Sequence, residues 1–211
     1  MTATEQSEGW ELLFDGTSTS LWRGYNRDTL PITWQAQDGK FSLLPGEGSG
    51  DIITKEKYSN FEFQTDFMLT DSANSGILYF VKEEADKTIW QNAPEYQLLD
   101  DATYIQMYGA EQMKKHLTGD NYDLQSAPAS YLKPIGTWNT AKIVVNNGKV
   151  THYLNGNKTI EYEVNSESFK NLVANSKFKE YPNFAQAKEG YIGLQDHGHP
   201  IYFKNIKVRK L

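Results

Sequence analysis

Cysteine is absent from this 211-residue chain, and its absence excludes disulfide bonds and thiolate chemistry. Long apolar runs are also missing, since no stretch approaches the ~18 consecutive apolar residues of a membrane-spanning helix. The composition, with 38% hydrophobic and 23% charged residues, is that of a folded globular protein. A chain of this length can bury a core that needs no covalent or metal cross-links.

The sequence has no dense basic region. Lysine and arginine number 21 against 27 aspartate and glutamate residues, which gives a net charge of −6. The C-terminal KNIKVRKL holds four basic residues, but they lie on an alternating segment and fit a solvated strand edge. We therefore expect no nucleic-acid partner.

The N-terminal MTATEQSEGW is polar and lacks the apolar core of a signal peptide. We expect residues 1–8 to be a disordered or trimmed segment and residues 9–211 to form a single domain. Two locations stay open on this evidence. The protein is cytoplasmic, or it is exported and its signal has been removed.

Several signatures of catalytic and metal sites are missing as well. The chain has no HExxH motif, no EF-hand loop, no P-loop and no GxSxG motif. Four histidines without cysteine leave few zinc-type spacings. His197 and His199 could still hold one divalent cation together with Glu95 or Asp196, so a metal stays an open alternative.

Short segments of alternating polarity, separated by turn residues, fill most of the sequence. In FEFQTDFML, Phe61, Phe63 and Phe67 share one face and polar residues occupy the other. Asp-Gly at residues 38–39 and Asn-Gly at residues 147–148 and 155–156 each separate two such segments. These pairs supply the positive φ angles that two-residue hairpins require.

Only two stretches favour a helix, residues 109–117 and residues 167–178, the second with Ser166 as its N-cap. Many strands with two helical insertions predict two packed antiparallel sheets. The sequence therefore predicts an all-β fold, a β-sandwich of jelly-roll character with one or two short helices.

Polar side chains collect on the segment PEYQLLD, residues 94–100. Tyr96 and Leu98 suit a core face, so Glu95 and Gln97 point the other way, about 7 Å apart along the strand. On a curved outer sheet the pair would lie in a concave groove and face one sugar. The alternative is an exposed polar face that makes cross-strand contacts.

The C-terminal GYIGLQDHGHPIYFKNIKVRKL looks like a terminal β-hairpin with more chemistry at its centre than a turn needs. Ile192 and Leu194 mark the core side, so Gln195 and His197 project outward. Asp196 could orient His197 or cap the turn. The imidazole could act as an acid, a base or a metal ligand, or it could be structural.

Three further segments carry polar residues that need an interpretation. Asn74 and Ser75 precede an apolar strand, where they form a turn or hydrogen-bond to sugar hydroxyls from the rim of a groove. His152 shares a strand face with an apolar residue, which favours a packed imidazole. Lys177 lies near the end of the second predicted helix, where a cation suits the helix dipole.

These segments follow one another in the order of a known family: GWELLFDGTSTSLWRGY, NSGILYF, PEYQLLD, KPIGTWNTAKIVV, VTHYLNGNKTIEYE, SKF and the C-terminal segment. On these motifs the chain resembles the 3-keto-disaccharide hydrolase domain family from about Gly9 to Leu211. PEYQLLD together with LQDHG and the final strand is a specific combination, although each motif alone is weak.

The resemblance implies a concanavalin A-like jelly-roll, in agreement with the sandwich predicted from the strand pattern. It also implies an enzyme that acts on an oligosaccharide or glycoside already oxidised to a ketone at C3, with a partner sugar 3-oxidoreductase. Because many relatives are exported, it favours a periplasmic or otherwise exported protein. Glu95 and His197 are the expected catalytic residues. The expected substrate-binding residues are Asn74, Ser75, Gln97, Asp100, Tyr122, Gln195 and Asp196.

Two positions depart from the pattern of the family. Tyr79 stands where relatives often have arginine, and the residues before Tyr122 differ from the small residues that are more frequent there. Both differences could alter the choice of substrate.

The chemistry follows from the ketone, because a carbonyl at C3 acidifies the proton on C2. Deprotonation gives an enolate, the C1 substituent leaves by β-elimination, and water can add back. The route needs a base, an enolate stabiliser and an acid. His197 or Glu95 could be the base or the acid, with Gln97, Gln195 and Asn74 holding hydroxyls or the enolate. A divalent cation would stabilise the enolate equally well.

Two other functions stay open at this point. One is a non-catalytic, lectin-like carbohydrate-binding module, because the same fold also serves lectins. The other is a conventional glycosidase, which uses paired carboxylates and an oxocarbenium-like transition state. A conventional glycosidase cleaves an unoxidised disaccharide, whereas a keto-specific enzyme does not.

Overall fold

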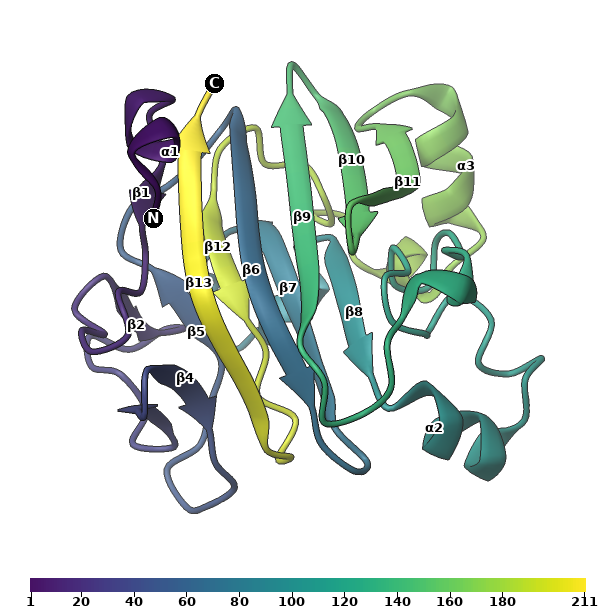
Figure 1. The fold of residues 1–211 in the computed structure, drawn as a ribbon. Helices are drawn as coiled ribbons and strands as arrows, with labels where there is room; N and C mark the ends of the chain where they lie inside the picture. Colours follow the sequence, from purple (N-terminus) through teal and green to yellow (C-terminus); the bar gives the residue numbers. More distant parts are fainter.

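Two antiparallel β-sheets pack face to face in the computed structural model, which describes residues 1–211 apart from the side chain of Ala129 (Figure 1). The larger sheet has the order β11 (Asn157–Glu163), β10 (Lys149–Leu154), β9 (Asn139–Asn146), β6 (Phe61–Leu69), β13 (Ile201–Lys210), β4 (Lys40–Leu43) and β3 (Trp34–Gln37), and β1 (Glu11–Leu12) pairs with β13. The smaller sheet has the order β2 (Trp22–Gly24), β5 (Ile52–Thr54), β12 (Tyr191–Leu194), β7 (Asn74–Val81) and β8 (Glu95–Leu99). In Figure 1 it lies behind the larger sheet. The all-β jelly-roll sandwich is therefore confirmed.

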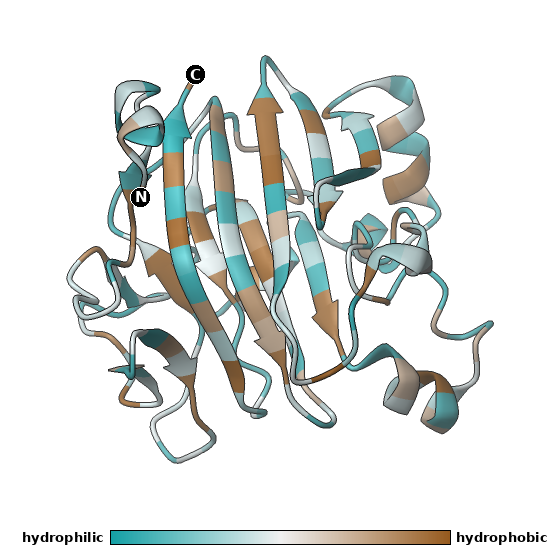
Figure 2. Cartoon of the chain, viewed as in Figure 1, coloured by the Kyte–Doolittle hydropathy of each residue, from teal (hydrophilic) through white to brown (hydrophobic). Residues whose placement is uncertain are grey.

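The space between the sheets is apolar because every strand turns alternate side chains toward the opposite sheet. Along β6, Phe61, Phe63, Phe67 and Leu69 are buried, and the charged residues between them are partly exposed. Figure 2 shows the same alternation as apolar and polar bands along β6, β9 and β13. The dry face predicted for this segment is confirmed.

Three two-residue turns connect neighbouring strands of the larger sheet. Residues 38–39 join β3 to β4, residues 147–148 join β9 to β10, and residues 155–156 join β10 to β11. Both residues of each pair have positive φ angles, between 50° and 83°. This is the backbone geometry that a type I′ hairpin requires, and it explains the Asp-Gly and Asn-Gly sequences.

The C-terminal segment is not the hairpin that the sequence suggested. β12 lies in the smaller sheet between β5 and β7, whereas β13 lies in the larger sheet between β6 and β4. Residues 195–200 therefore cross from one sheet to the other. Such a crossing is longer than a tight turn, which explains why this segment holds more polar side chains than a hairpin turn requires.

The helices are short, and one of them is displaced from its predicted position. α2 (Asp101–Tyr108) starts directly after β8, and residues 109–117 form mainly turns, so the helix predicted there is wrong. α3 (Glu167–Ala174) starts after its predicted N-cap Ser166, whose hydroxyl accepts from the backbone of the third helical residue. Three 3₁₀ helices are η1 (Ile89–Gln91), η2 (Ala129–Tyr131) and η3 (Lys177–Glu180). None of the helices in the described part of the chain has the length and apolar character needed to span a bilayer.

A short helix, α1 (Ala3–Ser7), occupies the segment that we expected to be disordered or trimmed, and it lies beside β13 in Figure 1. Thr2 and Glu5 form a capping box at its start. Glu5 also pairs with Lys207 of β13, and this hydrogen bond lowers the pKa of Glu5 to about 2. These contacts are the physical reason for order in a segment that carries no buried residue.

Tyr79 lies inside the sandwich and links the two sheets. From β7 its hydroxyl hydrogen-bonds with His152 Nε2 at 2.9 Å and with the Tyr162 hydroxyl at 2.6 Å. Burial lowers the pKa of His152 to about 3, so this imidazole is neutral and packed, as its strand pattern predicted. Tyr79 is fully buried in the core, which leaves it no direct contact through which to alter the choice of substrate.

We expect Tyr79→Phe to destabilise the protein by about 1–3 kcal/mol, because His152 and Tyr162 each lose a hydrogen-bond partner in the core. Thermal unfolding measures this as a fall in Tm of about 3–10 °C. Tyr202→Phe is the matched control, because Tyr202 is only partly buried on β13 and its hydroxyl has no hydrogen bond to any described residue. Equal losses in the two variants would contradict a role for the network.

Candidate active site

One pocket of about 110 Å³ on the outer face of the smaller sheet gathers side chains from distant parts of the chain. Its lining consists of Asn74, Trp90, Glu95, Gln97, Tyr122, Lys177, Gln195 and His197. All of these except Trp90 and Lys177 are residues that the sequence predicted for the site. The segments around residues 95 and 197 therefore meet at one hollow, as the catalytic hypothesis requires.

β7 and β8 form the floor of the pocket. Tyr96 and Leu98 of β8 pack in the main core, so alternation places Glu95 and Gln97 on the outer face, as predicted. Residues 119–122 hydrogen-bond along the free edge of β8, through Gly119 N to Gln97 O and Tyr122 N to Glu95 O. This cover explains why β8 is buried along its whole length, including its two polar residues.

A glycine on β7 makes room for the Glu95 carboxyl group. A Cβ atom at Gly76 would lie 2.2 Å from Glu95 Oε1, which is far inside contact distance. Gly76 pairs with Gln97 in the β7–β8 ladder, so the Glu95 side chain lies across the neighbouring strand. The sequence NSG therefore supplies the space that the carboxyl group occupies.

Glu95 is the single carboxylic acid among the described residues that line the pocket, and its pKa is strongly perturbed. It is only 3% exposed, and no described residue hydrogen-bonds to its carboxyl group. Burial raises the pKa of Glu95 to about 8, while the Lys177 cation opposes the rise and Asp51 adds to it. At neutral pH the group is therefore mostly protonated and can exchange a proton near the working pH of an enzyme.

Lys177, at the start of η3, brings a positive charge to the pocket. Its Nζ lies 4.2 Å from the ring centroid of Trp90 and 4.3 Å from that of Tyr122. Burial lowers the pKa of Lys177, and attraction to Glu95 and Asp123 opposes this shift. The two aromatic rings thus hold the ammonium group beside Glu95 through cation–π contacts.

Three amide side chains line the same pocket. Gln97 Nε2 donates to Asn74 Oδ1 at 2.9 Å, which fixes these two amides against each other. Gln97 Oε1, Asn74 Nδ2 and both polar side-chain atoms of Gln195 make no hydrogen bond to any other described residue. They are therefore free to donate to and accept from a bound ligand.

His197 lies at the mouth of the pocket on the crossing between β12 and β13. Asp196 holds this crossing, since its carboxylate accepts from Gly50 N and from Gly198 N, both at 2.9 Å. Its own backbone N–H donates to Asp51 at 2.8 Å. The fixed backbone presents the exposed His197 side chain to the pocket.

Three residues expected to bind substrate do not line this pocket. Asp196 caps the crossing as described above. The Ser75 hydroxyl is buried and donates to the carbonyl of Gln195 at 2.8 Å. Asp100 is buried and accepts from Ser72 N, and it also caps α2. Each of them satisfies backbone groups of segments that carry pocket residues.

The sequence reasoning missed Trp90 and misjudged Lys177. Trp90 lies on η1 in a connection without periodicity, where no pattern distinguishes it from a core residue. Lys177 was interpreted as a cation at a helix end, but α3 ends before it. The segment SKF is one of the motifs that carry the family resemblance, and this was the signal that could have identified Lys177.

The described residues do not supply a set of ligands for a metal ion. No three histidine, aspartate or glutamate side chains among them converge on one point. Glu95 and His197 line the pocket, but Asp196 is engaged with backbone N–H groups and His199 lies outside the lining. A divalent cation bound at Glu95 and His197 stays a prediction, and the reaction proposed for this pocket does not use one.

The chain is similar in sequence to a family of domains and to a protein that are both named for 3-keto sugar substrates. Residues 9–209 match the family model of the 3-keto-alpha-glucoside-1,2-lyase-like domain. The chain is 32% identical to a protein of Bacteroides thetaiotaomicron named 3-keto-disaccharide hydrolase, over 97% of this chain and 79% of that protein.

Two solved structures from Parabacteroides distasonis, both of candidate glycosyl hydrolases, have the same fold. One has a TM-score of 0.90 at 32% identity and covers 100% of this chain and 98% of the other. The second has a TM-score of 0.70 at 26% identity and covers 90% of this chain and 99% of the other. The match to the family model spans nearly the whole chain and includes every residue of the pocket. The chain therefore belongs to the family of 3-keto-alpha-glucoside-1,2-lyase-like domains.

Proposed function

We propose that the protein is a carbohydrate-active enzyme that cleaves 3-keto-glycosides by removing the proton on C2 and expelling the substituent on C1. Membership of the family and the name of the Bacteroides relative support this substrate class. The observation that carries the proposal is Glu95, a buried carboxyl group with a pKa raised to about 8 beside the Lys177 cation.

In this reaction His197 acts as the base and takes the proton from C2. The electron pair moves into the C2–C3 bond, and the C3 ketone becomes an enolate oxygen. Lys177 stabilises this negative charge, helped by the amide donors of the pocket. The enolate then collapses to the ketone, a double bond forms between C1 and C2, and the C1–O bond breaks. Glu95 gives its proton to the leaving oxygen.

Water then completes the hydrolysis, and the two proton transfers run in reverse. It adds to C1 of the enone, Glu95 takes its proton back, and His197 returns a proton to C2. The sum is hydrolysis of a glycoside without net oxidation or reduction. Without this second half the reaction is an elimination, which the family description names as a lyase.

The carboxyl content of the pocket favours this route over a conventional glycosidase. Two carboxyl groups flank the scissile bond in a conventional mechanism, about 5–9.5 Å apart. Among the described residues that line this pocket, Glu95 is the single carboxylic acid. One acid, one imidazole and one cation match an enolate mechanism better than an oxocarbenium mechanism.

The same groups also favour an enzyme over the alternative lectin-like module. A lectin needs amides and aromatic rings, which the pocket has, but it gains nothing from a buried carboxyl group without a hydrogen bond. Such a group destabilises the fold at high pH, and a perturbed carboxyl group in a pocket points to a chemical task. We therefore give Glu95 a catalytic role.

The substrate chemistry implies a preceding oxidation. A C3 ketone on a glycoside requires an oxidoreductase that removes two hydrogen atoms from the alcohol, so we propose a partner sugar 3-oxidoreductase. We also propose that the protein is periplasmic or otherwise exported, in keeping with the relatives on which the resemblance rests.

A direct assay tests the function. Purified protein is incubated with a 3-keto-glucoside and with its unoxidised parent, with and without a chelator, and release of the C1 substituent is followed by chromatography. We expect release from the ketone alone. Cleavage of the parent would indicate a conventional glycosidase, and binding without cleavage would indicate a lectin-like module.

We expect His197→Ala to lower kcat for the ketone about 10²–10⁴-fold, because the variant lacks the base that removes the C2 proton. Added imidazole should restore part of the lost rate, since a small base can enter at the mouth of the pocket. His199→Ala is the control and should retain activity, because His199 does not line the pocket. Equal losses in both variants would contradict the assignment.

A further inference from the structure

A second hollow adjoins the pocket on the same side of the sheet. Its volume is about 280 Å³, more than twice the 110 Å³ of the pocket itself. The two hollows share the side chains of Asn74, Gln97 and Tyr122. A ligand that fills the pocket and extends past these three residues therefore enters the second hollow.

The far wall of the second hollow comes from α2 and the turns that follow it. Besides the shared residues, its lining consists of Leu99, Tyr104, Tyr108, Gln112, Met113 and His116. Tyr104 and Tyr108 are one helical turn apart, and their ring centroids are 6.0 Å apart. Flat aromatic surface beside a few polar groups is the usual composition of a site for an organic ligand.

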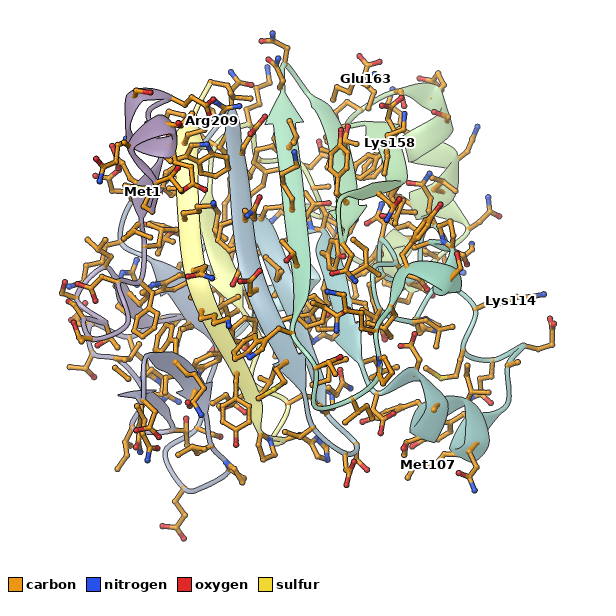
Figure 3. All side chains as sticks on the ribbon, viewed as in Figure 1. Met1, Met107, Lys114, Lys158, Glu163 and Arg209 are labelled. Carbon is orange, nitrogen blue, oxygen red and sulfur yellow. The ribbon has the colours of Figure 1, made fainter. Side chains whose placement is uncertain are left out.

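α2 has no buried residue, which is unusual for a helix inside a folded domain. Figure 3 shows Met107 of α2 at the edge of the molecule, directed away from both sheets. Met107 and Tyr108 are 62% and 53% exposed. Packing against a core therefore does not explain why the tyrosines stand on this helix.

Hydrogen bonds nevertheless hold the wall in place. Asp100 caps α2 and anchors it to Ser72 N, and Asp101 accepts from Thr118 N at 2.8 Å. His116 Nε2 lies 3.0 Å from Asp123 Oδ1, and the imidazole packs on the Tyr122 ring at 4.8 Å. A wall that is rigid but not buried is preorganised for a ligand.

We propose that this hollow is the subsite for the leaving group, and that it binds the second pyranose of a 3-keto-disaccharide. The proposal rests on the proposed function, which places the ketone-bearing ring in the pocket beside Glu95 and Lys177. The scissile bond then lies near Gln97 and Asn74, which both hollows share. The tyrosine rings face the apolar side of the departing sugar, and the exposed Gln112 side chain binds its hydroxyl groups.

Kinetics with two substrates test the subsite. A 3-keto-disaccharide occupies both hollows, whereas methyl 3-ketoglucoside fills the pocket alone. In a Tyr104→Ala, Tyr108→Ala double variant we expect kcat/KM for the disaccharide to fall about 10–100-fold, because contacts remote from the reacting bond contribute to its transition state. For the methyl glycoside we expect a change of less than about threefold.

Two controls separate binding from folding. Met107→Ala removes an exposed side chain of the same helix outside the hollow, and it should leave both substrates unaffected. A Tyr104→Phe, Tyr108→Phe variant keeps the rings and should retain most of the disaccharide activity. Equal losses for both substrates in the alanine variant, or no loss for either, would overturn the subsite.

A binding measurement keeps the subsite testable even if the proposed function fails. D-glucose, as a free leaving group, is titrated into the wild type and into the alanine double variant by ligand-observed NMR. We expect saturable binding to the wild type that weakens at least fivefold in the variant. Equal binding by both proteins would overturn the subsite, whether or not the wild type cleaves a ketone.

Discussion

Glu95→Gln should abolish most of the turnover of a 3-keto-glycoside, with a loss in kcat of about 10²–10⁴-fold and little change in KM. The amide has nearly the same shape as the acid, but it cannot give a proton to the leaving oxygen. Substrate contacts from the amides and from Lys177 remain in place. Steady-state kinetics at pH 7 measure the two parameters separately.

The pH dependence of wild-type activity follows from the same group. Because the pKa of Glu95 is raised to about 8, the protonated acid is present at neutral pH and disappears above that value. We expect kcat/KM to fall on the alkaline side with a midpoint near pH 8, because this parameter reports the pKa values of the free enzyme. A leaving group that needs no protonation, such as 4-nitrophenolate, should remove this alkaline limb.

The Glu95→Gln variant should lose activity but gain stability at alkaline pH. The pKa of Glu95 is about 8 in the folded protein against 4.5 for the ordinary group, so the folded state holds a proton that the unfolded chain releases. The contribution of this group to stability is therefore complete below pH 4.5, falls as the pH rises toward 8, and stays constant above it. Glutamine has no proton to release, so Glu95→Gln removes this pH-dependent fall in stability. The variant should therefore be more stable than the wild type by about 2–4 kcal/mol at pH 8 and equally stable at pH 4.

Glu47→Gln provides the matched control for both measurements. Glu47 is exposed and forms no hydrogen bond or ion pair with the described residues, so neither kcat nor the pH dependence of unfolding should change. Urea unfolding at pH 4 and pH 8 gives the comparison, in which all other titrating groups cancel. If Glu95→Gln loses stability at pH 8, the carboxyl group is charged and paired, and its role as the acid is wrong.

The outer face of β8 shows how much of the site the sequence contains. Alternation alone places Glu95 and Gln97 opposite Tyr96 and Leu98, and the structure confirms this division. The pattern does not reveal that residues 119–122 pair with the free edge of β8. That long-range pairing buries Glu95 and raises its pKa, so the position was predictable and the acidity was not.

The crossing after β12 shows the opposite limit. Gln195 and His197 project outward as the period of two predicts, but the neighbouring Asp196 is engaged with Gly50 N rather than with a ligand. A carboxylate next to a histidine has the same local sequence whether it binds a ligand or accepts a hydrogen bond from a backbone N–H group. The partner that decides between them lies 146 positions away along the chain, where no local pattern points to it.

Lys177→Met should lower kcat about 10²–10³-fold, an effect comparable to the loss of one donor that stabilises a developing oxyanion. Methionine keeps an unbranched apolar stem against Trp90 and Tyr122, so the pocket keeps its shape while the positive charge disappears. The Lys177 cation lowers the pKa of Glu95, and its removal should therefore move the alkaline limb of the activity profile to higher pH. A lysine remote from Glu95 would not produce this shift.

Lys177→Arg distinguishes charge from shape at the same position. Arginine keeps a cation that stacks on aromatic rings, so the alkaline limb should stay near its wild-type position, and kcat should fall less than in the methionine variant. A 3-keto substrate whose C2 proton is replaced by deuterium adds a further readout. Loss of the enolate-stabilising charge slows proton removal, so the deuterium effect on kcat should increase in Lys177→Met. An unchanged pH profile together with an unchanged deuterium effect would contradict the role of Lys177, and the enolate would then need another stabilising group.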